Sequence, residues 1–239
     1  MAQTTYVEAM KTVAEVDTAV MCAINHIILT QIGIKKGIKT FGEAGVRSIY
    51  KEMKQFHDRE VVRPLKPSQI TKEIKNRALA YLMFLKMKTS GEIKARGCTD
   101  GRPQRVYKSK QETSSPTAAI ESIFVTSAMA AKEGRDVATV DIPGAFLQTE
   151  ASDETFIKLQ GAIVESLLKI NPDWKQYVIY EGIKKIPTIY SEALKALYGT
   201  VDTSTLFFED LSKFLLDDLG FVRNAYDWCV VNKLINGKQ

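Results

Sequence analysis

The chain has 239 residues, of which 45% are hydrophobic and 26% are charged, as in an ordinary globular protein with one large domain or two small subdomains. No apolar run is long enough to cross a bilayer, because residues 20–34, the best candidate, are interrupted by Asn25, His26 and Gln31. The acidic residues near the N-terminus do not suit a secretory signal, and the three cysteines follow no metal or disulfide motif. We therefore expect an intracellular protein, cytoplasmic or nuclear, that is not secreted and has no membrane partner.

The net charge of +5 is modest, but the basic residues are unevenly distributed. One segment, from Lys86 to Lys110, is rich in basic residues and contains only Glu92 and Asp100 as acidic ones. Such a cluster predicts a phosphate-binding surface, and the alternative is a solvated hairpin face without a ligand. The basic residues of this cluster are Lys86, Lys88, Lys94, Arg96, Arg102, Arg105, Lys108 and Lys110.

The N-terminal part of the chain is predicted to be helical. Apolar residues recur near helical spacing over residues 5–32, which predicts a first helix. Gly33 and Gly37 follow this segment and would end the helix. A second helix is expected over about residues 41–57, which show the same periodicity.

A loop, a short helix and a hairpin are predicted next. Residues 63–67 contain two prolines and are expected to form a loop, after which Ser68 would cap a helix that runs to about Leu79. The apolar run of residues 81–88 and the run of residues 92–97 flank a turn that contains glycine, which predicts a β-hairpin.

A helix followed by a strand is predicted upstream of Asp141. Ser115 would cap a helix that has Pro116 at its first position and continues over residues 117–132, and Gly134 would close it. Side chains alternate over residues 135–141, which predicts a strand that ends at the aspartate. We expect this strand to lie in the centre of a sheet and to pair with the strand near residues 228–231.

The rest of the chain is predicted to alternate between short strands and helices. Helices are expected at residues 162–170 and 203–219, and strands at residues 154–159, 177–180 with 188–190, and 228–233. The sequence Asn236-Gly237 after the last strand is a hairpin-turn signal, so the sheet is expected to continue beyond Gln239.

Asp141 is the strongest candidate for a metal-binding residue in the sequence. It would stand at the end of a strand and is followed closely by Pro143 and Gly144. A carboxylate in this position can hold a hard cation such as Mg²⁺, which takes one or two carboxylates and leaves its other positions to water and phosphate. The alternative is an aspartate that caps a turn and binds no metal.

Five segments, in order, resemble motifs of copia-type retrotransposon reverse transcriptases over about residues 48–239. The segment Val140-Asp141-Ile-Pro-Gly-Ala-Phe-Leu147 is similar to the first catalytic motif of that family, in which a strand-end aspartate precedes Ala-Phe-Leu or Ala-Tyr-Leu. The other four are Ile93-Lys94-Ala95-Arg96, Ser114-Ser115-Pro116-Thr117, Leu194-Lys-Ala-Leu-Tyr-Gly199, and Leu219-Gly220-Phe221 with Asp227 and Cys229.

The resemblance implies roles for the residues around Asp141. This aspartate would be a catalytic ligand of Mg²⁺, for which Mn²⁺ could substitute, and the carbonyl oxygen of Ile142 would be a second ligand. Phe146 would be the steric gate that excludes ribonucleotides, and Ala145 would leave room beside it. The alternative for Phe146 is packing in the core.

The resemblance also implies roles for the basic cluster. Arg96, with Lys88 or Lys86 across the hairpin, would bind the triphosphate of the incoming nucleotide, because forked guanidinium donors and lysine point charges suit phosphate oxygens. The residues expected to contact nucleic acid are Lys94, Arg102, Arg105 and Lys108.

Two features depart from the family pattern. The pair Asp217-Asp218 falls at the end of a predicted amphipathic helix, so we interpret it as solvated helix-end acids and not as the Asp-Asp of a Tyr-x-Asp-Asp hairpin. That hairpin would follow Gln239. Residues 200–208 carry Asp202 and no basic residue, which predicts impaired template positioning and suggests a decayed copy.

The sequence as a whole predicts an α+β protein with a mixed or antiparallel sheet and packed helices. The resemblance implies a helical N-terminal lead (residues 1–40), a fingers-like region (41–135) and a partial palm (136–239) of a right-hand polymerase. The implied function is that of a fragment of an RNA-directed DNA polymerase, with RNA template, DNA primer, deoxynucleoside triphosphates and the remainder of the parental polyprotein as partners.

The fragment is expected to be inactive alone, because a two-metal site needs carboxylates from more than one palm strand. The alternative is a degenerate or domesticated remnant that binds nucleic acid without catalysis.

Overall fold

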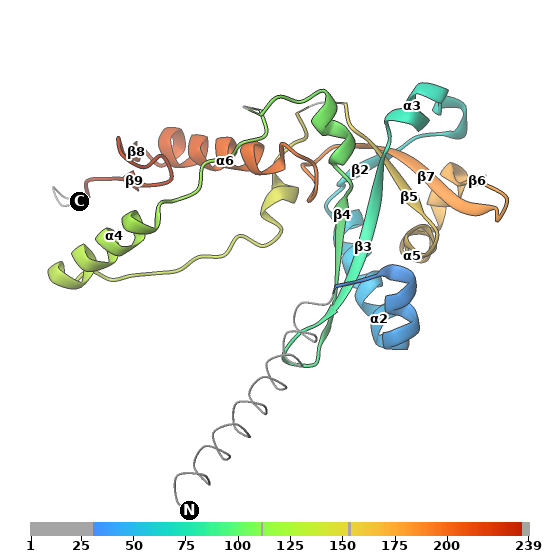
Figure 1. The fold of residues 1–239 in the computed structure, drawn as a ribbon, viewed down its shortest axis with the longest axis horizontal. Coiled ribbons are helices and arrows are strands. Elements are labelled where there is room, and N and C mark those ends of the chain that lie inside the picture. Colours follow the sequence, from blue (N-terminus) through green and yellow to red (C-terminus); the bar gives the residue numbers. More distant parts are fainter. Residues whose placement is uncertain (1–30, 111, 153, 236–239) are drawn as a thin grey trace, which may run out of the picture. The chain divides into compact units, whose positions relative to one another are not determined.

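A computed structural model of the chain describes residues 31–110, 112–152 and 154–235. They form an α+β protein with several helices and a mixed sheet, as the sequence predicted (Figure 1). The chain divides into two compact units, each built from three separate stretches, so strands β3, β4, β5 and β7 contribute residues to both. Of the described residues, unit 1 contains 31–58, 81–97 and 159–189, and unit 2 contains 59–80, 98–158 and 190–235.

Unit 1 begins with a short strand and a long helix. Almost all of the helix predicted over residues 5–32 lies outside the described residues, and its last position belongs to β1 (Ile32–Gly33), which pairs with β3. Helix α2 (Ile34–Asp58) contains the predicted helix of residues 41–57 but starts earlier and is kinked at Gly42. Gly37 lies buried inside this helix and does not end one, so that prediction was wrong.

The predicted hairpin of unit 1 is confirmed. Strands β3 (Leu79–Met87) and β4 (Ile93–Thr99) pair with each other, and in the turn the N–H of Gly91 donates to the carbonyl of Lys88 at 2.9 Å. Because side chains alternate along a strand, one face of the hairpin buries Met83 and Leu85 while the other carries the basic residues.

Helix α5 (Ala162–Ile170), predicted over the same residues, packs against α2 and completes the core of unit 1. It is followed by η4 (Pro172–Tyr177) and by the predicted hairpin of β6 (Ile179–Glu181) and β7 (Ile186–Ala193). The buried apolar side chains of this unit are Ile49, Met53, Phe56, Tyr81, Met83, Leu85, Ala95, Leu159, Ile163, Val164, Leu167, Trp174 and Ile189.

Side chains from α2 occupy the open edge of β4. Ser48 accepts the backbone N–H of Ala95 at 2.5 Å, and the Glu52 carboxylate accepts that of Gly97 at 3.0 Å. An open strand edge presents unpaired N–H groups to other chains. Two side chains one helical turn apart therefore close this edge.

Unit 2 contains both antiparallel and parallel strand pairs. Strand β2 (Val62–Pro64) pairs antiparallel with β7, and β5 (Phe156–Gln160) pairs parallel with the start of β3. The expected loop at residues 63–67 is therefore partly a strand.

The helix predicted after that loop is shorter than expected. It consists of η1 (Pro67–Gln69) and α3 (Lys72–Arg77), and α3 is capped by Thr71, whose hydroxyl accepts the N–H of Ile74 at 3.2 Å. Ser68 lies inside η1, so the prediction that it caps the helix was wrong. Leu79, the expected last residue of the helix, begins β3.

Helix α4 (Ile120–Glu133) lies in unit 2 and ends at Gly134, in the left-handed conformation, as predicted. Its N-terminus is not capped by Ser115. The Asp227 carboxylate instead accepts hydrogen bonds from the side chain of Ser122 and from the N–H of Ala119, the latter at 2.9 Å, and these bonds lower the pKa of Asp227. This cap could not be predicted from local sequence, because it is supplied from a distant part of the chain.

The strand predicted over residues 135–141 was wrong. Residues 135–142 form no regular element, and Val137 and Val140 are 79% and 83% exposed. They also do not pair with the segment around residue 230, because β9 (Val231–Asn232) pairs with β8 (Val222–Arg223).

The C-terminal stretch of unit 2 contains one continuous helical segment, which runs from Thr203 to Asp218. Helix α6 (Thr203–Lys213) continues into a π-helical turn, η5 (Phe214–Asp218), and Asp217 and Asp218 are exposed there, as predicted. The two remaining short helices of the unit are η2 (Arg102–Val106) and η3 (Ala145–Gln148). No helix in the described part of the chain combines the length and apolarity that a membrane crossing requires.

Candidate functional site

A groove on the outer face of the β3–β4 hairpin, in unit 1, gathers basic side chains. Lys94 and Arg96 are exposed on β4, and the residues between and beside them, Ala95 and Gly97, are buried on the opposite face. The groove has a volume of about 300 Å³ and is lined by Gln31, Phe84, Lys86, Lys88, Thr89, Lys94 and Arg96. Both lysines considered as triphosphate ligands, Lys86 and Lys88, therefore line it together with Arg96.

Three of these four cations are available to a ligand. Within the described residues, Lys86, Lys94 and Arg96 form no ion pair with a carboxylate. Lys88 forms an ion pair with Glu92, and the hydrogen bond and charge of Lys88 lower the pKa of Glu92. Both side chains of that pair are about half exposed, so the pair contributes little stability and a polyanion could compete for Lys88.

The remainder of the basic cluster belongs to unit 2 and is distributed differently. In η2, Arg105 is exposed, whereas Arg102 donates from Nε and Nη2 to Asp100 at 2.8 and 2.6 Å and lowers the pKa of that carboxyl. Lys108 is only 8% exposed and forms an ion pair with Asp202, whose side chain is 11% exposed. Lys108 was predicted to contact nucleic acid as part of an exposed basic surface, but its side chain is buried and does not lie on that surface.

Asp202 has a structural partner. Burial by itself raises the pKa of this carboxyl, but the hydrogen bond and charge of Lys108 and the hydroxyl of Ser152, at 3.0 Å, outweigh it, and the pKa is lowered. Asp202 is the N-cap residue of α6, and its carboxylate bonds to Lys108 and Ser152 and not to the first turn of the helix. Its presence therefore does not require the explanation that the chain is a decayed copy.

Asp141 is exposed in the irregular segment of unit 2, and Ile142 beside it is half-buried. Among the residues that the structure describes, no three His, Cys, Asp or Glu side chains are grouped so that they could hold a metal ion. The described residues therefore bring no cluster of metal-ligating side chains to Asp141.

Phe146 lies on η3 and is packed among aromatic rings. Its ring centroid is 4.6 Å from that of Tyr198 and 5.7 Å from that of Phe207 on α6. This is the packing role considered as the alternative for Phe146. Ala145, the preceding residue, is half-buried.

The Leu-Tyr-Gly segment is fixed by a close backbone approach in unit 2. The N–H of Thr99 donates to the carbonyl of Tyr198 at 2.6 Å. Gly199 has a φ of 95°, and a Cβ on it would stand 2.0 Å from the Thr99 carbonyl oxygen. Only glycine tolerates both conditions, so the glycine of this motif has a structural reason.

Two contributors to these sites were missed by sequence analysis. Phe84 lines the basic groove, a position that strand alternation with Lys86 could have indicated. Arg59 holds the turn after Asp141 through contacts with residues more than eighty positions away, for which the sequence gives no signal.

The sequence matches no protein-family model, no curated protein and no solved structure at a significant level.

Proposed function

We propose that this chain is part of an RNA-directed DNA polymerase of the copia type, and that alone it binds nucleotide phosphates without polymerising them. The observation that carries the proposal is the hairpin groove, where Lys86, Lys94 and Arg96 are free of carboxylate partners among the described residues and Phe84 lies beside them. Lysine charges and a guanidinium fork suit phosphate oxygens, and an aromatic ring offers a face on which a base can stack.

The loop that follows Asp141 would carry the polymerase roles in this proposal. Asp141 and the carbonyl of Ile142 would contribute to binding Mg²⁺ or Mn²⁺, and Ala145 and Phe146 would lie near the sugar of the nucleotide. Such a metal site needs carboxylates that the described residues do not bring to Asp141. We therefore expect no primer extension by these 239 residues on an RNA or DNA template.

A second candidate function is non-catalytic binding of nucleic acid. It is favoured by the exposure of Asp141 in an irregular segment, since a catalytic aspartate is normally held rigidly by its surroundings. In this case the groove would bind the phosphate backbone without a preference for nucleotides.

A competition experiment separates the two candidates. A fluorescent single-stranded oligonucleotide is bound to the chain, and its anisotropy is followed while dATP or inorganic tripolyphosphate is added. A nucleotide site predicts displacement at a lower concentration of dATP than of tripolyphosphate, because the base contributes through stacking. Equal displacement by both compounds would support the non-catalytic candidate and argue against the first.

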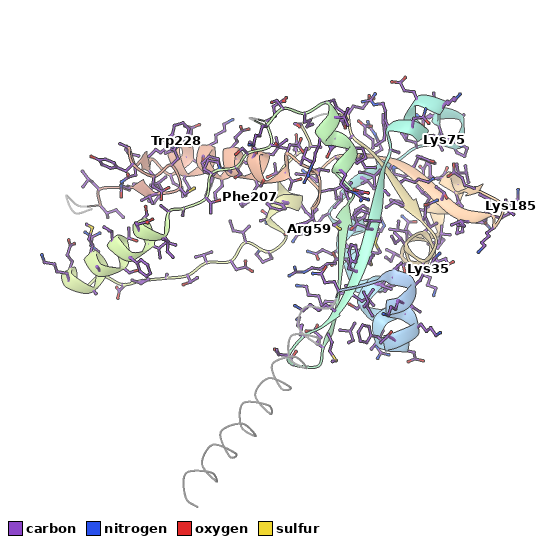
Figure 2. All side chains as sticks on the ribbon, in the orientation of Figure 1. Lys35, Arg59, Lys75, Lys185, Phe207 and Trp228 are labelled. Carbon is purple, nitrogen blue, oxygen red and sulfur yellow. The ribbon has the colours of Figure 1, made fainter. Side chains whose placement is uncertain are left out.

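A matched pair of variants tests whether the groove is the binding surface. The groove variant replaces Lys94 and Arg96 with glutamine and so removes two charges from the groove. The control variant replaces Lys35 and Lys185 with glutamine, which removes two exposed charges of unit 1 that do not line the groove (Figure 2). If three groove cations contact phosphates, the logarithm of affinity should fall with the logarithm of salt with a slope of about −2.

The groove variant should lower the magnitude of this slope by about 1.4, whereas the control variant should leave it almost unchanged. An equal loss in both variants would mean that net charge alone attracts the oligonucleotide, and the groove would have no specific function.

A further inference from the structure

The turn between Asp141 and Phe146 is held by a side chain from a distant part of unit 2. The Arg59 guanidinium donates from Nη2 to the carbonyl of Pro143 at 3.2 Å and from Nη1 to the carbonyl of Gly144 at 3.3 Å. Gln148 donates to the same Pro143 carbonyl at 3.2 Å. Arg59 is half-buried and directly follows the end of α2 (Figure 2).

The chemistry of both partners suits this contact. A guanidinium presents parallel donors in a fixed fork and can bond two successive carbonyls at once, which the single ammonium of a lysine cannot do in the same geometry. Gly144 has a φ of 60°, and a Cβ on it would lie 2.7 Å from Arg59 Nη1. Glycine at this position therefore provides both the turn conformation and the room for the guanidinium.

The turn has a second anchor immediately after it. The N–H of Leu147 donates to the carbonyl of Gly144 at 2.9 Å, and the ring of Phe146 packs on Tyr198 and Phe207. Asp141, in contrast, is exposed. Among the described residues, the Pro143–Gly144 turn bonded by Arg59 is therefore the fixed part of this loop that lies nearest to Asp141 in the sequence.

We propose that Arg59 is a positioning residue, which sets the distance between the carboxylate of Asp141 and the ring of Phe146 by holding the Pro143–Gly144 turn. Its functional meaning rests on the proposed polymerase origin, in which these two residues serve one nucleotide. We call the two hydrogen bonds from Arg59 to the carbonyls of Pro143 and Gly144 the clamp. The clamp depends on no enzymatic activity, so it can be tested without one.

Amide hydrogen exchange of the 239-residue chain tests the clamp, with the Leu147 amide as the reporter. In Arg59→Lys, which retains the charge but not the fork, exchange of this amide should become about tenfold faster, as expected when roughly 1.4 kcal/mol of local stabilisation is lost. Arg47→Lys is the control, since Arg47 is exposed and pairs only with Glu43 on α2 among the described residues. Unchanged exchange of Leu147 in Arg59→Lys would overturn the proposal.

Chemical rescue separates a positioning role from a general loss of stability. In Arg59→Ala, low-millimolar methylguanidinium should restore the protection of Leu147, whereas methylammonium at the same concentration should not. Restoration by both ions, or by neither, would contradict the role of the guanidinium fork.

A double substitution provides an independent check. Gly144→Ala should accelerate exchange of Leu147 less in the Arg59→Ala background than in the natural sequence, because the clash with Nη1 is gone and only the strain of the positive φ remains. Equal effects in the two backgrounds would refute the contact. The oligonucleotide experiments on the hairpin groove do not involve Arg59, so failure of the proposed function and failure of the clamp give different results.

Discussion

Removing Lys108 should destabilise unit 2 by leaving a buried carboxylate without its counter-charge. The side chains of Lys108 and Asp202 are 8% and 11% exposed, so water can replace little of the lost interaction. Breaking one partner of a buried ion pair typically costs about 3–5 kcal/mol. Because Ser152 still donates to Asp202 in the variant, we expect Lys108→Met to lie near the lower limit, at about 3 kcal/mol.

Native-state hydrogen exchange measures this loss where it occurs. The amide of Leu206 donates to the carbonyl of Asp202 at 3.0 Å and reports on the start of α6. A loss of about 3 kcal/mol corresponds to a roughly hundredfold faster exchange of this amide when it exchanges by opening of the unit. The double variant Lys108→Met with Asp202→Leu removes both charges and should regain most of the lost protection.

The pH dependence of the same amide has a defined sign. The pKa of Asp202 is lowered in the folded state, so the stability from this pair is present above the ordinary pKa of about 4 and is lost as the pH falls through the lower folded value. In Lys108→Met this acid dependence should disappear or reverse, because burial, which raises the pKa of Asp202, is then opposed only by hydrogen bonds from Ser152 and the backbone. The reasoning is refuted if Lys108→Met changes the free energy of unfolding by less than about 0.5 kcal/mol, the range typical of surface substitutions.

Three further substitutions test other contacts of the structure. Glu52→Ala should lower the free energy of unfolding by about 1.5 kcal/mol, because it removes the acceptor of the Gly97 N–H. It should also increase self-association through the unpaired β4 edge, measured by light scattering, and Glu52→Gln should have a much smaller effect. Gly199→Ala should cost about 3 kcal/mol or more in urea unfolding, because its Cβ would overlap the Thr99 carbonyl oxygen at a positive φ; an unchanged midpoint would contradict this geometry. Asp227→Asn should accelerate amide exchange in the first turn of α4, and in the natural sequence this protection should be lost as the pH falls through the lowered pKa of Asp227; exchange that is insensitive to both changes would show that the cap is not formed.

Local apolar periodicity was sufficient to predict the elements whose partners are nearby or whose pattern is strong. Helix α5 has the predicted bounds because its apolar side chains, such as Ile163 and Leu167, recur at helical spacing and are buried together. The β3–β4 hairpin was also predicted correctly, because its two apolar runs are joined by a short turn with glycine at a positive φ.

Predictions that depended on distant partners were less successful. From its residue type and position in the sequence, Lys108 was predicted to belong to the exposed basic cluster. The fold pairs it instead with Asp202, which is 94 positions away in the sequence. Arg59 gave no signal for the same reason, since its partners follow it by more than eighty residues. For the groove residues the prediction was better, because Lys94 and Arg96 share a strand and alternation places them on one face.

The absence of the predicted strand at residues 135–141 and the exposure of apolar side chains on α4 have one physical explanation. Ile123, Phe124 and Val125 are each more than half exposed, and three successive helical positions point about 100° apart, so cover would be needed on more than one side of α4. Residues 135–141 contain the β-branched residues Val137, Thr139 and Val140, which favour a strand, but a strand is stable only when its backbone is paired, and in the described part of the chain no backbone pairs with this segment. Both segments carry the pattern of buried elements, while the described residues supply neither the strand partner nor the apolar surface that this pattern requires. Asp141 stands at the end of this unpaired segment, so in the proposed role of metal ligand its rigidity would have to come from the Arg59 contact with the following turn or from backbone that pairs with residues 135–141.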